Sequence, residues 1–234
     1  MKKFFLVMVL LFTSTLFLGL NFEELKNDFV YIQSYENLDD VNNFINILQE
    51  DNSTYNDSNL LALLADCYRE KANWSDSNKE EYYEEALKLA KDAIKIDNKN
   101  GYAYYVAAAS IGQLAQFKGI VTSLFMLGDF DHFLKYAEMY GSDIPGVWIA
   151  LGLRYRDTPW PLNNFGRSEK YLKTAMDTDP AYPSSYMELI TLYEKWNKKD
   201  EMVEIAETLL DLPLDDRYVA LHERAQQMAQ DYLK

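Results

Sequence analysis

The sequence predicts an all-α protein, built as a solenoid of antiparallel helix pairs. Apolar residues recur at three- and four-residue spacing along most of the chain, so that they share one face of each helix. The sequence has no alternating apolar and polar runs of strand length, which leaves little scope for a sheet. In addition, one set of helical offsets recurs several times along the chain, as is typical of stacked repeats.

The clearest copy of these offsets lies at residues 148–180. Its first helix has the W-x2-L-G-x2-Y order of a tetratricopeptide repeat. Large rings fill one stripe of such a helix, the glycine leaves room for a neighbouring helix, and a proline ends the unit because it cannot continue a helix. The repeat-defining residues are Trp148, Leu151, Gly152, Tyr155, Ala175 and Pro180.

Further copies flank this one. Downstream, the same offsets predict a first helix at 186–193 and a second helix at 202–209. Upstream, they predict a pair at 61–68 and 86–93, followed by another first helix at 104–111. Four helical pairs are therefore expected.

The remaining segments complete the array. Segment 120–141 is apolar and longer than a usual second helix. Residues 21–33 and 38–49 carry apolar residues at helical spacing, and we expect them to form an N-terminal pair that caps the array. A helical segment from Asp215 onward forms the C-terminal cap. Residues 21–234 are thus predicted to be a single helical-repeat domain.

Two units carry insertions between their helices, at 73–76 and 158–162. Each insertion contains a tryptophan, Trp74 in the first and Trp160 in the second. Because insertions in a solenoid project from one edge, an exposed tryptophan would form a contact surface. The alternative is that both side chains fold back over neighbouring helix ends.

The first residues have the layout of a secretory signal peptide. Lys2 and Lys3 precede an uncharged, apolar run at 4–20. A membrane-spanning helix needs about twenty apolar residues, so residues 1–20 are predicted to be either a signal peptide or an uncleaved N-terminal membrane anchor. The protein is therefore expected to be periplasmic or secreted, and in the second case anchored to the membrane.

Composition and motifs argue against several classes of function. The formal net charge of −14 disfavours nucleic-acid binding, because phosphate contacts depend on lysine and arginine. Cys67 is the only cysteine, which excludes an internal disulfide and a metal site with several cysteines. His132 and His222 have acidic neighbours in sequence, but adjacent residues on a helix point apart. With no phosphate-binding loop or nucleophile motif, we predict no enzyme activity, no catalytic residue, no cofactor and no metal.

Two stretches of the chain carry a resemblance to a known family. They are YAYYVAAASIGQLAQFKGIVTSL at 102–124 and the insertion TPWPL at 158–162. Over residues 61–210 the chain resembles the T component (TatT family) associated with TRAP transporters, a periplasmic tetratricopeptide protein of bacteria. The resemblance implies helices around a hydrophobic pore, assembly as an oligomer and pairing with the transporter's substrate-binding component. Members are often lipoproteins, whereas this chain has no cysteine directly after its N-terminal segment.

The resemblance predicts a non-enzymatic accessory component of a TRAP-type uptake system, which binds a hydrophobic small molecule, the substrate-binding subunit, or both. The middle helices carry more apolar side chains than one helix pair needs, and the resemblance places a cavity among such helices; a filled core is the alternative. Ligand pockets are mostly apolar with a few placed polar groups, and Gln113 or Arg156 would be the polar anchor. The candidate cavity residues are Tyr104, Tyr105, Ala108, Ile111, Gln113, Leu114, Phe117, Leu124, Phe125 and Arg156.

The alternative function is a general tetratricopeptide scaffold that mediates protein–protein interactions in the cell envelope. Its partner would be another envelope protein or a further copy of this chain. Repeat arrays present certain first-helix positions to a concave groove. Here these positions are occupied by Arg69, Tyr105, Gln113, Arg156, Thr191 and Glu194, among others.

Overall fold

The computed structural model describes residues 20–118 and 120–234. Within these ranges the chain is mainly helical and has no strand, which confirms the all-α prediction. The elements are α2 (Phe22–Tyr35), α3 (Leu38–Glu50), η1 (Thr54–Asn56), α4 (Ser58–Trp74), α5 (Lys79–Ile96), α6 (Gly101–Phe117), α7 (Ile120–Tyr140), α8 (Pro145–Asp157), α9 (Phe165–Thr178), α10 (Pro183–Lys195), α11 (Lys199–Leu210), η2 (Asp216–Tyr218) and α12 (Val219–Tyr232).

The predicted N-terminal segment, residues 1–20, lies outside the described residues except for Leu20. In the part of the chain that is described, no helix combines the length and the apolar character needed to cross a bilayer.

The helices form the predicted pairs: α4 packs on α5, α6 on α7, α8 on α9 and α10 on α11. Local sequence explains where several of them begin. Asp57 and Asn100 accept hydrogen bonds from backbone N–H groups in the first turns of α4 and α6, as N-cap residues do. Pro145 and Pro183 occupy the first turns of α8 and α10, where the missing N–H of proline costs nothing.

Two glycines allow close contacts within pairs. A Cβ atom added at Gly101 would lie 2.3 Å from the carbonyl carbon of Tyr140, at the end of α7. A Cβ atom at Gly152 would lie 2.6 Å from Cδ2 of Leu172. Because neither distance is sterically allowed, the absence of a side chain at these positions sets how closely α6 approaches α7 and α8 approaches α9.

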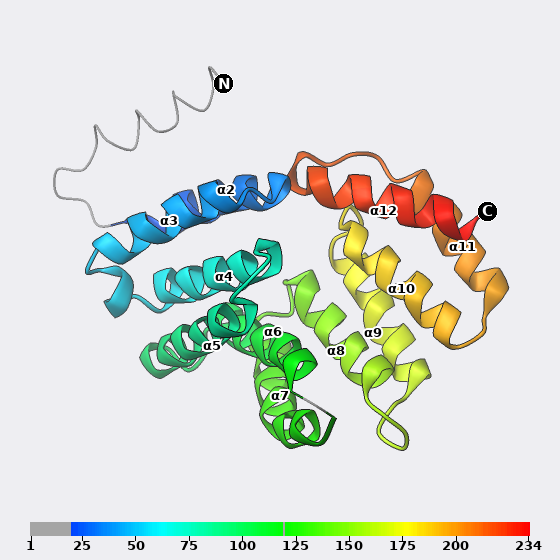
Figure 1. Ribbon diagram of the computed structural model, residues 1–234, viewed down its shortest axis with the longest axis horizontal. Helices are drawn as coiled ribbons and strands as arrows, with labels where there is room; N and C mark the ends of the chain where they lie inside the picture. The colour runs from blue at the N-terminus through cyan, green and yellow to red at the C-terminus, as the bar shows by residue number, and fades with distance from the viewer. Residues whose placement is uncertain (1–19, 119) are drawn as a thin grey trace.

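The helices α2, α4, α6, α8, α10 and α12, which we call the first helices, form a closed ring. Each contacts the next, and α12 in turn contacts α2 (Figure 1). The second helices, α3, α5, α7, α9 and α11, each pack on the first helices that precede and follow them. The sequence predicts one cap at each end of the array. Instead, the two ends of the array contact each other.

Side chains 188 positions apart in the sequence close the ring. Arg224 of α12 donates hydrogen bonds to both carboxylate oxygens of Glu36, with Nη2 2.5 Å from Oε1. Next to this pair, η2 contacts α2 and is held by the α9–α10 connection. There, Arg217 Nη1 and the Tyr218 hydroxyl donate to Oδ2 of Asp179 at 2.7 and 2.8 Å.

The two inserted tryptophans have different surroundings. Trp74 belongs to the last turn of α4, together with Asn73, and packs against the core. Only the second half of the 73–76 insertion is therefore in the connection. Trp160, in the α8–α9 connection, is 85% exposed. Trp74 thus folds back against the protein, as the alternative prediction has it, whereas Trp160 is available for contacts.

Candidate binding site at the centre of the ring

The apolar residues predicted to line a cavity do not converge on one. Those that pack in the core are Tyr104, Ala108, Ile111 and Leu114. Those that are exposed near the α6–α7 connection are Phe117, Leu124 and Phe125. The structure thus divides these residues between the core and the surface.

The polar residues predicted for the cavity are also separated. Arg156 is buried and donates hydrogen bonds to Asp157 and to Glu188 of α10. Gln113 accepts a hydrogen bond from a neighbouring glutamine on α6. Tyr105, in contrast, faces the centre of the ring, where the structure brings together a different set of side chains.

The centre of this set is a polar stripe on α4. Asp66, Arg69, Glu70 and Asn73 follow one another at helical spacing and share a face. Arg69 Nε donates to Asp66 Oδ1 at 2.7 Å, and Arg69 Nη2 donates to Glu70 Oε1 at 2.5 Å. Asn73 Nδ2 donates to the other oxygen of Glu70 at 2.7 Å. The side chains of Asp66 and Arg69 are only 3% and 10% exposed, so this part of the stripe is almost fully buried.

Helices α2 and α6 add to the stripe from either side. The Tyr102 hydroxyl donates to Oδ2 of Asp66 at 2.6 Å, and Gln33 Nε2 donates to Oε1 of Glu70 at 3.0 Å. The ammonium group of Lys26 lies 3.8 Å from the centroid of the Tyr102 ring, which is a cation–π geometry. Lys26 therefore lies over an aromatic ring and near the charge of Asp66, which raises the pKa of the lysine, but no direct ion pair joins the two side chains among the described residues.

Tyr105 lies between α4 and α8. Its ring centroid is 5.9 Å from Cζ of Arg69, and a Cβ atom at Gly146 would lie 2.4 Å from its hydroxyl. Gly146 thus makes room for the phenol ring. Burial raises the pKa of Tyr105, so the hydroxyl stays protonated and available as a donor.

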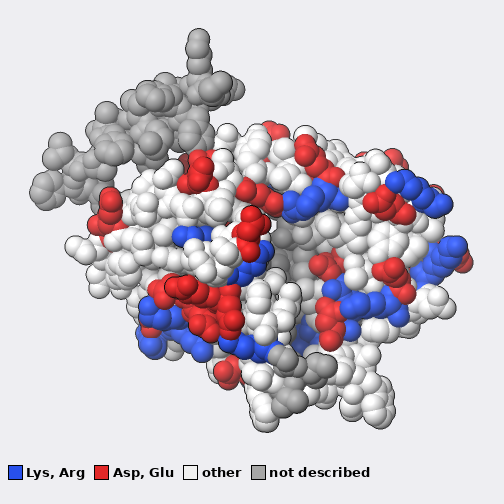
Figure 2. Space-filling model, viewed as in Figure 1, with Lys and Arg blue, Asp and Glu red and all other residues white. Residues whose placement is uncertain are grey.

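Tyr182 and Arg224, which belong to the C-terminal part of the ring, lie close enough to the stripe on α4 for its charges to act on them. Burial raises the pKa of Tyr182, at the start of α10, and the charges of Glu70 and Arg69 act on that pKa in opposite directions. Hydrogen bonds with Glu36 raise the pKa of Arg224, and the charge of Glu70 adds to that rise. Figure 2 shows the molecule hollowed at this centre. We call the following residues the ring-centre cluster: Lys26, Asp66, Arg69, Glu70, Tyr102, Tyr105 and Tyr182.

Two cationic side chains of the cluster have donors that remain unused. Both oxygens of Asp66 and both oxygens of Glu70 already accept hydrogen bonds. Among the residues that the structure describes, the Lys26 ammonium donates no hydrogen bond and forms no ion pair, and Arg69 Nη1 is likewise without a partner. Burial lowers the pKa of Lys26, although the charge of Asp66 raises it. The cluster can therefore still donate hydrogen bonds from two cationic groups, whereas much of the accepting capacity of Asp66 and Glu70 is already used.

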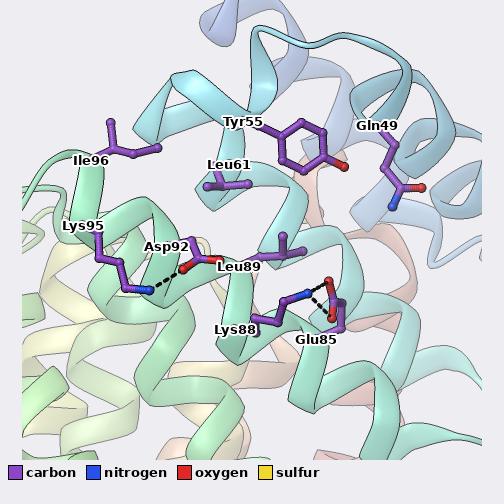
Figure 3. Close-up of a pocket in the computed structure, with 9 residues that line it drawn as sticks. All are labelled: Gln49, Tyr55, Leu61, Glu85, Lys88, Leu89, Asp92, Lys95 and Ile96. Atoms are coloured by element: carbon purple, nitrogen blue, oxygen red, sulfur yellow. Dashed lines mark hydrogen bonds and ion pairs between the residues drawn. The ribbon is translucent and has the colours of Figure 1, made fainter.

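Two depressions on the outer surface are less suited to binding. The first, of about 480 Å³, lies between α5 and the segment from α3 to α4 (Figure 3). Its charged side chains pair with each other: Lys88 with Glu85 at 2.9 Å and Lys95 with Asp92 at 2.7 Å. The second, of about 500 Å³, shares Lys88 and Glu85. Neither is lined by a predicted cavity residue, and no cluster in the described ranges has the side chains to hold a metal ion.

Part of this site is predictable from the sequence. The repeat pattern predicts that Arg69 and Tyr105 face the groove, whereas it does not predict the positions of Lys26, Asp66 and Tyr182. One signal was present: the acidic and basic residues of α4 interrupt an otherwise apolar helix at helical spacing, which indicates a polar face turned toward the protein. Nothing local to α2 or to the α9–α10 connection points to the same centre.

Paired helices in a closed array, with a polar centre on the side of the first helices, define a tetratricopeptide-like helical-repeat scaffold. A solved structure agrees. A thermophilic tetratricopeptide-repeat protein of Thermus thermophilus superposes with a TM-score of 0.68 at 17% identity, covering 91% of this chain and 99% of that one. Such folds are generally non-enzymatic scaffolds and are compatible with protein–protein interaction.

The family model described as "Regulator of microtubule dynamics protein 1-3" matches residues 30–153, more than half of the 234 residues. The chain therefore belongs to this family. A comparison with curated proteins finds no match. The tetratricopeptide-like fold is thus confirmed, while neither match concerns a TRAP transporter.

Proposed function

We propose that the protein is a non-enzymatic scaffold that holds a segment of a partner protein at the ring-centre cluster. The observation that carries this proposal is the convergence of side chains from α2, α4, α6 and the start of α10 on one hollow, with donors left unused. Repeat arrays bind partners on their concave surfaces. Tyrosine, which supplies three of the seven cluster residues, and arginine, which supplies one, are also enriched among the residues that contribute most to protein interfaces.

The family description supports a protein partner. It refers to the regulation of microtubule dynamics, and microtubules are protein assemblies. We therefore expect the cluster to bind a polypeptide segment rather than to convert a small substrate.

A photo-crosslinking residue at Tyr182 tests this proposal in the full chain, in cells of its source. The matched control carries the same residue at Tyr55, which is exposed on the outer surface. We expect a peptide adduct at position 182 and none at 55, identified by mass spectrometry. The absence of an adduct at 182, or equal labelling at both positions, would contradict the proposal.

The narrower role in a TRAP-type uptake system stays a prediction. It rests on the resemblance of segments 102–124 and 158–162, and it adds a hydrophobic small molecule and a transporter's substrate-binding subunit as binding partners. The same experiment separates the two functions. A lipid or other small-molecule adduct, or a crosslink to a substrate-binding subunit, would favour the uptake role.

We also propose that the chain is exported, and is either periplasmic, secreted or membrane-anchored. Lys2, Lys3 and the apolar run after them support this. A variant that lacks residues 1–20 is expected to remain in the cytoplasm, as measured by cell fractionation. Normal export of that variant would show that this segment is not a targeting signal.

A further inference from the structure

We propose that the ring centre recognises a carboxylate of the bound segment, with Lys26 as the main contact and Arg69 Nη1 beside it. The carboxylate belongs either to an acidic side chain or to the C-terminus of the segment. This inference rests on the proposed function, since it names the chemistry that the partner brings to the same site.

The first argument is the distribution of donors. Asp66 and Glu70 together already accept five hydrogen bonds, at least one on each carboxylate oxygen, so only part of their accepting capacity remains for a cationic side chain of a partner. The unused groups are the ammonium of Lys26, one nitrogen of Arg69 and the hydroxyl of Tyr105, all of which donate. A carboxylate accepts from several donors at once, and such charge-assisted hydrogen bonds are about twice as strong as neutral ones.

The second argument is that Lys26 differs from its cationic neighbour. Arg69 is fixed by two carboxylates, so it stabilises the fold. Lys26 lies over the rings of Tyr102 and Phe29 without an ion pair among the described residues. Burying a charged group without an ion pair costs stability. The charge of Asp66 acts on Lys26, but a ligand carboxylate would supply a counter-ion that the ammonium group contacts directly.

The acidic groups around the site do not prevent a ligand carboxylate from binding. The carboxylates of Asp66 and Glu70 are offset by Arg69 and by hydrogen bonds from Tyr102 and Gln33. The net charge of −14 repels acidic peptides at long range, but at about 0.15 M salt such repulsion is screened beyond roughly 8 Å. Binding measurements therefore belong at that ionic strength.

The first test is stability. Lys26→Met keeps the aliphatic stem over the Tyr102 ring and removes the charge. We expect its melting temperature to stay close to that of the parent, because the loss of the desolvation cost of the buried ammonium group offsets the loss of its attraction to Asp66. The matched control is Lys95→Met, on an exposed ion pair, with little expected change. A marked drop in the melting temperature of Lys26→Met would show that Lys26 is a structural residue, and the proposal would fail.

The second test is binding, measured by fluorescence anisotropy with the full chain and labelled peptides. The probes are an amidated oligoglutamate, an oligoglutamine with a free C-terminal carboxylate, an amidated oligoglutamine and an amidated oligolysine. We expect binding of the first, the second or both, which distinguishes side-chain from C-terminal recognition, and no binding of the last two. Lys26→Met should weaken that binding about tenfold or more, and Lys95→Met should not.

Three outcomes would overturn the inference: no binding of either carboxylate probe, equal binding of amidated oligoglutamine, or parent-like affinity in Lys26→Met. Each leaves the proposed function standing if position 182 still crosslinks to a polypeptide. Loss of that crosslink, in contrast, removes the proposed function itself.

Discussion

Two ion pairs with the same spacing on helices show how surroundings decide what a residue contributes. Asp66 pairs with Arg69, and Asp92 pairs with Lys95, each three positions apart. The first pair is nearly buried, while Lys95 is 76% exposed. Removing one partner of a buried pair costs about 3–5 kcal/mol, whereas an exposed pair contributes about 0–1 kcal/mol.

We therefore expect Asp66→Asn to lower the free energy of unfolding by several kcal/mol, and Asp92→Asn to change it by less than about 1 kcal/mol. Urea unfolding of the two variants measures both values. Equal losses would mean that Asp66 is not the counter-ion that fixes Arg69.

The carboxylate of Asp66 also makes the stability of the fold depend on pH. Burial raises the pKa of Asp66, but the charges of Arg69 and Lys26 and the hydrogen bond from Tyr102 outweigh it, so the pKa lies below its ordinary value. A depressed folded-state pKa adds stability above the unfolded pKa of about 3.9, and this is lost as the pH falls through the folded value. Asp66→Asn should accordingly weaken the loss of stability below about pH 4.

At this scale the sequence reveals only part of the site. Arg69 and Tyr105 could be predicted because the repeat pattern fixes which first-helix positions face the groove. Lys26 and Tyr182 could not, because they lie on a capping helix and in a connection, where no repeat pattern applies. The apolar residues of α6 and α7 carry the same periodic signal whether they line a cavity or fill a core, so spacing alone cannot separate these two roles.

At the scale of elements the sequence is a better guide, because helix signals are local. Helical spacing, N-cap residues and prolines lie within a few positions of each boundary, and the four predicted pairs are present. The α8–α9 contact illustrates the limit: the W-x2-L-G-x2-Y pattern requires space at Gly152, but only the structure shows that Leu172 occupies it.

Gly152→Leu tests that contact. A leucine side chain would overlap Leu172, and overpacking of this kind costs about 1–3 kcal/mol or more. We expect a clearly lower melting temperature by circular dichroism. Gly128→Leu is the control, because a Cβ atom at Gly128 meets nothing within 4 Å. Equal melting temperatures for the two variants would count against close packing of α8 on α9.

At the scale of the whole molecule, ring closure is the feature that sequence reasoning could not reach. It depends on small rotations summed over successive helix pairs, and it joins Glu36 to Arg224 across most of the chain.

Glu36→Arg places like charges at the junction, and we expect faster hydrogen exchange in α2 and α12. The double variant Glu36→Arg/Arg224→Glu restores the opposite charges and should return exchange toward the parent rate. If the single variant exchanges as slowly as the parent, this pair does not hold the ring.

A linear repeat array begins to unfold at its ends, because a terminal repeat packs against only one neighbouring repeat. In this protein every first helix has two neighbours, so no repeat is positioned to fray first. We therefore expect a single all-or-none denaturation, with circular dichroism and tryptophan fluorescence reporting the same midpoint. Once Glu36→Arg opens the ring, the N-terminal helix pair becomes a free end, and its amide protons should exchange well before those of the central helices.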